Sequence, residues 1–240
     1  MKKPADLKLI VDGKRIDGRG PLDLRNVEMK VGVVERADGS ALVRFGKTTV
    51  VASVYGPRPL YPRYLQEYES CILRCRYSMT PFSVDERKSP GPDRRSIELS
   101  KIIRVALEPA IFLEEFPRTV IDVFIDVLEA DGSTRVTGIN AASLALAIAG
   151  VPMRDLVAAC SVGKVEDTLV VDLCGMEDNY SQSDVCIAFM PGKNKMSLLQ
   201  MDGILSKEEL KELIKIGKEK CMEIYEMQKN ALRKAFEVVG

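Results

Sequence analysis

The alternation of hydrophobic and polar positions predicts a protein of short strands and three helices. Nine stretches have the apolar pattern of strands: residues 27–35, 40–45, 48–55, 71–78, 119–128, 156–162, 168–173, 184–189 and 196–201. Apolar residues recur near helical spacing in three other segments: residues 93–113, 139–149 and 206 onward. Strands followed by helices thus occur twice. This predicts an α+β fold of two similar βα halves packed together, residues 1–151 and 152–240.

Capping residues and prolines mark the predicted ends of these elements. Asp93 is suited to cap the first helix, and Pro109 is expected to bend that helix or end its regular part. Ser206, followed at the third residue by Glu209, is a typical start of the last helix. We expect residues 56–63 to form a proline-rich loop between two strands.

Composition limits the chemistry available to the chain. Its 35 Lys and Arg balance 35 Asp and Glu, so a globally basic nucleic-acid binder is not indicated, although a local basic patch is allowed. The absence of histidine excludes Ser-His and Cys-His catalysis and leaves proton transfer to carboxylates, Lys, Tyr or Cys. Six cysteines without a Cys-x-x-Cys pair are expected to be buried, reduced thiols. Without a signal peptide or membrane-spanning run, we expect a cytoplasmic protein that binds no membrane.

The segment Glu129–Arg135 joins an apolar strand to a small-residue helix through a polar turn. Ser133 and Thr134 would place hydroxyls and free backbone N–H groups at a helix N-terminus, where the helix dipole attracts anions. Arg135 adds a cation whose forked donors fit phosphate. The alternative is an ordinary strand-to-helix turn capped by Ser or Thr, which is the simpler interpretation of the turn alone.

Positive charge is concentrated between Arg58 and Arg104, where ten Lys and Arg face six Asp and Glu. Arg is the preferred partner of phosphate, and three tyrosines interleave with Arg63, so bases could stack beside a phosphate contact. Arg94 and Arg95 begin a helix, where cations oppose the dipole unless an anion or an acidic partner compensates them. For any one arginine, a solvated, salt-bridged surface is the alternative.

Two aspartates, Asp178 and Asp184, flank a polar stretch between the predicted strands 168–173 and 184–189. A strand–loop–strand hairpin is expected to return both carboxylates to one end of a sheet. There they could hold Mg²⁺, or one could stay protonated beside the other. An acidic loop that caps its own turns is the alternative. Together with the turn and the basic segment, the pair favours a polyanion site.

Six motifs follow one another along nearly the whole chain: Arg15–Arg19, Ser78–Phe82, Arg94–Lys101, Phe116–Thr119, Asp131–Arg135, and Asp178 with Asp184. In this order they resemble the RNase PH family of phosphorolytic exoribonucleases. Residues 79–88 and 150–156 are more similar to the catalytic RNase PH-like subunits of archaeal exosomes than to bacterial RNase PH.

The resemblance implies a ribosomal protein S5 domain 2-like fold. It implies stepwise 3′→5′ cleavage of single-stranded RNA by inorganic phosphate, which releases nucleoside diphosphates and runs in reverse as 3′ tailing. It also implies a hexameric ring, with three copies of this subunit and three of a catalytically inactive RNase PH-like paralogue. RNA-binding cap proteins would sit on one face of that ring.

Site residues carry over position by position. The residues that match the phosphate site are Arg95, Ser133, Thr134 and Arg135. Those that match RNA-backbone contacts near the 3′ end are Arg63, Arg94 and Arg118. Asp178 matches the key catalytic acid, and Asp184 the second carboxylate that would bind Mg²⁺ with it.

Some points stay open at this stage. Related polynucleotide phosphorylases have Lys two residues after the second aspartate, where this chain has Cys186, so the third group at the metal is undetermined. Either Ser133 or Thr134 could supply the main hydroxyl, and Asp178 could act by proton transfer or through the metal. Two other functions remain: a homohexameric RNase PH that trims tRNA 3′ ends, and a non-catalytic ring scaffold that only positions RNA.

Overall fold

The first sheet of the computed structural model, which describes residues 8–237, has five strands in the order β3-β4-β5-β7-β6. These are β3 (Val27–Val31), β4 (Gly39–Phe45), β5 (Thr48–Pro59), β6 (Ile72–Met79) and β7 (Thr119–Glu129). Neighbouring strands are antiparallel except β6 and β7, which are parallel. Because parallel strands end at the same edge of a sheet, the segments that follow β6 and β7 lie side by side.

The second sheet has four antiparallel strands in the order β11-β10-β8-β9. These are β8 (Ala158–Val165), β9 (Thr168–Val171), β10 (Ser183–Met190) and β11 (Lys195–Gly203). The expected hairpin between residues 168–173 and 184–189 is wrong, because β8 lies between β9 and β10 and pairs with both. The segment that joins them contains a short helix, α3 (Gly175–Tyr180).

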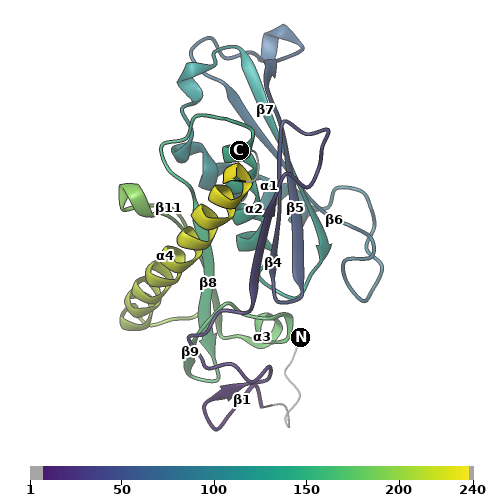
Figure 1. Cartoon of the computed structure of the whole chain (residues 1–240). Helices are drawn as coiled ribbons and strands as arrows, with labels where there is room; N and C mark the ends of the chain where they lie inside the picture. Colours follow the sequence, from purple (N-terminus) through teal and green to yellow (C-terminus); the bar gives the residue numbers. More distant parts are fainter. Residues whose placement is uncertain (1–7, 238–240) are drawn as a thin grey trace.

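A two-stranded sheet of β1 (Ile10–Val11) and β2 (Lys14–Arg15) precedes the first sheet along the chain. Three longer helices are α1 (Arg94–Leu107), α2 (Thr134–Ile148) and α4 (Lys207–Glu237). Helix α2 contacts β4, β5 and β7 of the first sheet and β8 and β10 of the second, and nearly all of its residues are buried. A helix that is apolar all round is suited to this position between two sheets. Helix α1 packs against β6, and α4 lies along β8 (Figure 1). The predicted α+β class is therefore confirmed.

The predicted helix starts are confirmed by their hydrogen bonds. The Asp93 carboxylate accepts the Ser96 N–H at 2.7 Å, and the Ser96 hydroxyl accepts the Asp93 N–H at 2.9 Å. Ser206 and Glu209 form the reciprocal pair before α4, at 2.8 and 3.2 Å. Helix α1 ends at Leu107, and a 3-10 turn that contains Pro109 follows it, as the position of the proline predicts.

The prediction of a loop over residues 56–63 is partly wrong, because β5 continues to Pro59. Residues Arg58 and Pro59 pair with β7 after an irregularity in register. β4 pairs with β5 only as far as Val54, so beyond that point one edge of β5 has no strand beside it. Proline is tolerated on such an edge because its missing N–H is not needed for pairing.

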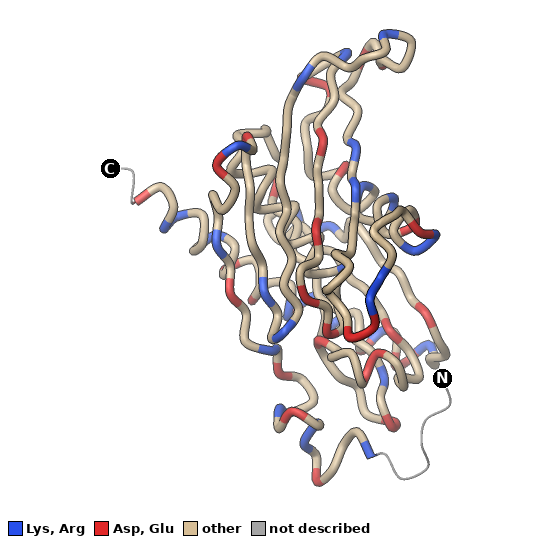
Figure 2. The backbone as a smooth tube through the Cα atoms, turned by 90° about the vertical axis from the view of Figure 1, so that its right-hand side faces the viewer, with Lys and Arg blue, Asp and Glu red and all other residues tan. Residues whose placement is uncertain are grey.

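Several other properties of the described residues bear on function. All six cysteines are free, and residues 8–237 contain no group of three or more His, Cys, Asp or Glu side chains arranged to hold a metal. None of the described helices has the length and apolar character needed to cross a bilayer. Figure 2 shows Lys and Arg interspersed with Asp and Glu along the chain. The division of the chain at residue 151 stays a prediction.

Candidate functional site: an anion seat facing two carboxylates

The polar turn after β7 is held by a close approach of backbones. Gly132 has φ +73°, a conformation that side chains disfavour, and Ser133 adopts a left-handed conformation with φ 55°. A Cβ atom on Gly132 would lie 2.7 Å from the carbonyl oxygen of Leu173 and 2.8 Å from the nitrogen of Gly175. The turn thus presses directly against the N-terminus of α3, and the Asp131 carboxylate accepts the Gly175 N–H at 3.0 Å.

The hydroxyl of Ser133 is engaged within the protein. It lies 2.7 Å from the Ser161 hydroxyl and donates to the carbonyl of Leu173 at 2.8 Å, and the Leu173 N–H donates to Ser161 at 3.3 Å. A consistent set of protons closes this ring, and it uses the only proton of Ser133. Ser133 therefore makes no capping hydrogen bond to α2, contrary to the ordinary cap considered from the sequence, and it has no proton left to donate to an anion.

The hydroxyl of Thr134 is arranged differently. It accepts a hydrogen bond from the buried Tyr77 hydroxyl at 2.9 Å, which leaves its own proton free to donate. Thr134, like Ser133, lines a cavity and a neighbouring cleft that are described below. Because the Ser133 side chain does not cap α2, the first backbone N–H groups of that helix are also available to an anion.

Two arginines face the same place from different elements. Arg135, in the first turn of α2, has a side chain that is 22% exposed, and its Nε atom is buried without a hydrogen-bond partner among residues 8–237. Its guanidinium lies 4.0 Å from the carboxylate of Asp184. Arg95, in the first turn of α1, lines the same two cavities as Thr134. The guanidiniums of Arg95 and Arg135, each at a helix N-terminus, thus border one cleft. An anion bound there would offset the repulsion between each cation and its helix dipole.

Asp178 on α3 and Asp184 at the start of β10 supply the carboxylates. Burial raises the pKa of Asp178, and the charges of Arg95 and Arg135 oppose the shift. Burial, together with the charge of Asp178, raises the pKa of Asp184 to about 6. The expected juxtaposition of the two residues is therefore present, although a helix and a strand provide it instead of a hairpin.

The groups described so far border two neighbouring spaces, which share Arg95, Thr134 and Asp178 in their linings. A cavity of about 540 Å³ lies between the turn, α3 and the loop after β6, and Arg87 and Lys88 of that loop line it. A narrow cleft beside it is lined by Arg95, Thr134, Arg135, Asp178, Asp184 and Cys186, among others. Burial raises the pKa of the Cys186 thiol to about 12, so Cys186 adds no charge to this cleft.

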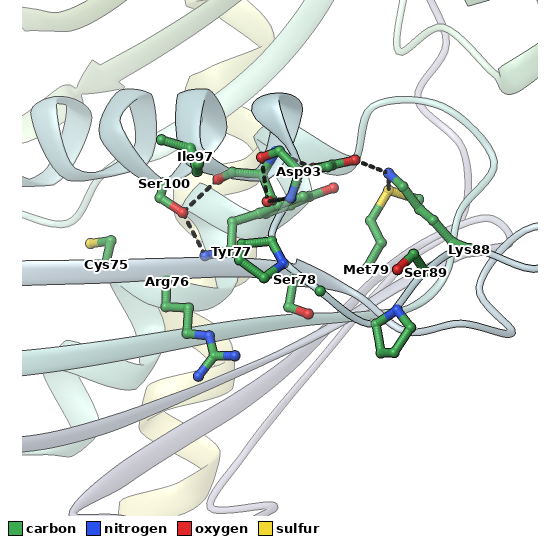
Figure 3. Close-up of a pocket in the computed structure, with 14 residues that line it drawn as sticks. Cys75, Arg76, Tyr77, Ser78, Met79, Lys88, Ser89, Asp93, Ile97 and Ser100 are labelled. Atoms are coloured by element: carbon green, nitrogen blue, oxygen red, sulfur yellow. Dashed lines mark hydrogen bonds and ion pairs between the residues drawn. The ribbon is translucent and has the colours of Figure 1, made fainter.

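The loop over residues 80–93 is tied down beside the cavity. Figure 3 shows Lys88 directed toward Asp93 at the start of α1 and toward the sulfur of Met79. The Lys88 ammonium lies 3.1 Å from the Asp93 carboxylate and 3.3 Å from that sulfur. A separate pocket of about 210 Å³ lies between β6, this loop and α1. Lys88 thus borders this pocket and the cavity of about 540 Å³, and it links the loop to the helix that carries Arg95.

The remaining predicted RNA contacts lie elsewhere. Arg94 is exposed at the start of α1 and lines neither cavity. Arg63 lies in the short turn η1 (Arg63–Leu65) beyond β5, and Arg118 immediately precedes β7 and stacks over Tyr68 at 5.0 Å. Because β5 and β7 are antiparallel, both residues lie at the opposite end of the sheet from the turn (Figure 1). The eleven residues of β7 correspond to about 35 Å.

The structure also identifies site residues that the sequence reasoning missed. Tyr77 lies in an alternating strand, where its phenol among the apolar residues at alternate positions is its only distinguishing feature. Arg15 and Glu177 form an ion pair behind α3 in which both side chains are fully buried. The Arg15–Arg19 motif gave a signal for Arg15, but nothing in the local sequence indicated that Arg15 pairs with Glu177.

Comparison with known proteins defines the class. Residues 23–152 match the model of domain 1 of the 3′ exoribonuclease family, and residues 155–220 match domain 2. The chain belongs to this family, which is the RNase PH family.

More particular similarities are to exosome proteins. Exosome complex component Rrp41 of Pyrococcus furiosus is 58% identical over 237 residues, which are 98% of this chain and 95% of that protein. The protein of that name from Pyrobaculum calidifontis is 49% identical over 100% of this chain and 98% of its own length. Among solved structures, a chain of the Archaeoglobus fulgidus exosome with RNA bound to the active site superposes with a TM-score of 0.79 at 25% identity, covering 90% of this chain and 93% of that chain. Rice Rrp46 superposes with a TM-score of 0.82 at 25% identity, covering 91% and 100%.

Proposed function

We propose that this chain is the phosphorolytic 3′→5′ exoribonuclease subunit of an exosome ring. One observation carries the proposal: the cleft that is lined by Thr134, Arg135 and Arg95 is also lined by Asp178 and Asp184. The similarity of this chain to exosome components over nearly its whole length supports the assignment to an exosome. Single-stranded RNA is the substrate, inorganic phosphate the co-substrate, and nucleoside diphosphates the products. The reverse reaction extends a 3′ end.

The chemistry follows from the charges around the cleft. An oxygen of inorganic phosphate attacks the phosphorus of the last phosphodiester, and the bond from that phosphorus to the 3′ oxygen breaks. Two anions must approach one another, so Arg95, Arg135 and the Thr134 hydroxyl screen their repulsion. The departing 3′ oxygen needs a proton or a compensating charge. Asp178 lines the same cleft as the phosphate seat, which is the set of Arg95, Thr134 and Arg135, and it would supply the proton or the charge.

The donor set at Asp178 and Asp184 fits Mg²⁺. Carboxylate oxygens are its preferred protein ligands, and Mg²⁺ is usually held by one or two carboxylates with several waters retained. The raised pKa of Asp184 reflects burial and the charge of Asp178, and a divalent cation between the two residues would relieve that repulsion. Bound Mg²⁺ would stabilise negative charge that develops on the leaving oxygen. Because the Cys186 thiol is neutral, the remaining ligands of a bound Mg²⁺ would be water or substrate.

The assembly that we propose is a hexameric ring in the cytoplasm. It contains three copies of this chain and three of a catalytically inactive RNase PH-like paralogue, and RNA-binding cap proteins cover one face. In such a ring, Arg63 and Arg118 would contact RNA well upstream of the 3′ end, because about 35 Å separates them from the phosphate seat. Arg94 would approach the RNA from its exposed position at the start of α1.

The function is tested with the ring assembled from this chain and its RNase PH-like partner. Labelled single-stranded RNA is incubated with and without inorganic phosphate, and the products are separated. We expect release of nucleoside diphosphates, only when phosphate is present. Cleavage without phosphate, or release of monophosphates, would rule out phosphorolysis.

The contrasting hydroxyls of the turn give a paired prediction. Thr134→Val removes the free donor, so the KM for phosphate is expected to rise by about 10- to 100-fold, the usual value of a hydrogen bond to a charged group. Ser133→Ala leaves the KM unchanged but breaks the Ser161–Leu173 ring, which lowers the free energy of unfolding by about 1–3 kcal/mol. Initial rates over a phosphate series and thermal unfolding measure the two effects. The opposite pattern would assign the phosphate contact to Ser133.

A further inference from the structure

Helix α3, which presents Asp178, is too short to be stable by itself. It has six residues, far below the length at which an isolated helix persists in water. Its position therefore depends on what holds it. The Asp131 carboxylate of the turn before α2 accepts the N–H of Gly175, the first residue of the helix, and the side chain of Glu177 makes the other anchor.

That second anchor is the buried pair of Arg15 and Glu177. Arg15 donates from Nε to one Glu177 oxygen at 2.7 Å and from a terminal nitrogen to the other. Its terminal nitrogens also donate to the carbonyls of Val171 and Asp172 at 2.5 and 2.9 Å. One guanidinium thus joins the end of β9 to α3, and both charged side chains have no exposed surface.

Glu177 has a second task at the start of the helix. Its carboxylate accepts the backbone N–H of Cys174 at 3.0 Å, and Cys174 is the residue that precedes α3. This is the reciprocal half of a capping box. The forked contact with Arg15 therefore fixes the direction of the carboxylate that caps the helix.

Glu177 and Asp178 are consecutive, so their side chains point about 100° apart around the helix. Fixing Glu177 toward the interior sets the rotation of α3 about its axis, and that rotation directs Asp178 into the cleft. We infer that Arg15 is a positioning residue for the reaction, acting through Glu177 to aim the Asp178 carboxylate at the scissile bond. This inference rests on the function proposed above.

The test replaces Arg15 by Lys in the assembled ring. Lys keeps the charge that Glu177 needs but cannot make the forked contact, so α3 loses its fixed rotation. We expect kcat for phosphorolysis to fall by about 10- to 100-fold, as is typical when a supporting partner of a reactive group is removed. The KM for phosphate should stay within about twofold of the wild type, because Thr134, Arg135 and Arg95 lie on other elements.

A matched control and an independent readout separate the possible outcomes. Arg74→Lys alters another forked Arg–carboxylate pair, with Asp122 on the first sheet, and should leave kcat unchanged. Amide hydrogen exchange of residues 175–180 should speed up in Arg15→Lys and not in Arg74→Lys. An unchanged kcat in Arg15→Lys, or a rise in KM that accounts for the whole loss, would overturn the inference. If the wild-type ring itself shows no phosphate-dependent cleavage, the proposed function fails, whereas the exchange result still reports whether Arg15 anchors α3.

Discussion

Replacing Asp178 by Asn should lower the kcat of phosphorolysis by about 10²- to 10⁴-fold, the range that a positioned acid–base group contributes. Asn has nearly the same shape and keeps the helix that carries it, but it can neither donate a carboxyl proton nor bind Mg²⁺ as an anion. The KM for phosphate should change little, because the proposed phosphate ligands Arg95, Thr134 and Arg135 lie on α1 and α2. Single-turnover cleavage of labelled RNA at saturating phosphate measures the loss directly.

The control for this substitution is Asp126→Asn. Asp126 is an exposed aspartate of β7 that lines neither cavity of the site, so its loss should leave kcat unchanged. If Asp178→Asn keeps most of the wild-type rate, the carboxylate has no role in the chemical step, and the proposed site is wrong. If a higher Mg²⁺ concentration restores the kcat that Asp178→Asn has lost, Asp178 acts mainly through the metal and not by proton transfer.

The direction of a hydroxyl could not be predicted from the turn alone. Ser133 and Thr134 are adjacent and chemically similar, so the sequence left both as phosphate ligands. Their roles separate only because Ser161 and Leu173, from the second half of the chain, close a ring around Ser133, whereas Tyr77 donates to Thr134. These partners are 28, 40 and 57 residues away in sequence, beyond the reach of local pattern.

The juxtaposition of Asp178 and Asp184 was predicted by the wrong topology. A hairpin was expected because the polar stretch between two apolar runs has no helical periodicity, and a helix of six residues is too short to show one. The insertion of β8 between β9 and β10 is a long-range pairing that no local signal specifies. The carboxylates meet nonetheless, because only a few residues separate α3 from the start of β10.

The basic segment shows the opposite limit. Composition placed Arg63, Arg94 and Arg95 in one basic segment, and the resemblance added Arg118 to the predicted RNA contacts. Of these four arginines, only Arg95 lines the cleft with Thr134 and Arg135. The long strands β5 and β7 carry Arg63 and Arg118 to the far end of the sheet. Charge counts along a sequence therefore predicted a surface for a polyanion, while the register of β5 on β7 determines which of these arginines lie near the turn.

The second large effect is expected for Gly132→Ala, which should lower both the Tm of the protein and its catalytic activity. A Cβ there would stand 2.7 Å from the Leu173 carbonyl oxygen and from the Cys174 carbonyl carbon, so the turn and α3 must move apart. The left-handed conformation costs about 1–2 kcal/mol and the clash about 1–3 kcal/mol. At about 2–4 °C per kcal/mol for a chain of this size, the Tm of the ring should fall by about 10 °C.

Gly150→Ala is the matched control, because Gly150 has the same φ of +73° but nothing lies within 4 Å of its missing Cβ. It carries the conformational cost without the clash, so its Tm should fall by about half as much and its kcat should be unchanged. In Gly132→Ala, separation of the phosphate seat from Asp178 by even 1 Å should reduce kcat/KM by about 100-fold at a temperature where both variants are folded. Equal losses of activity in the two variants would mean that the contact between the turn and α3 does not set the geometry of the site. A loss confined to Gly132→Ala would assign that role to the close approach of the two backbones.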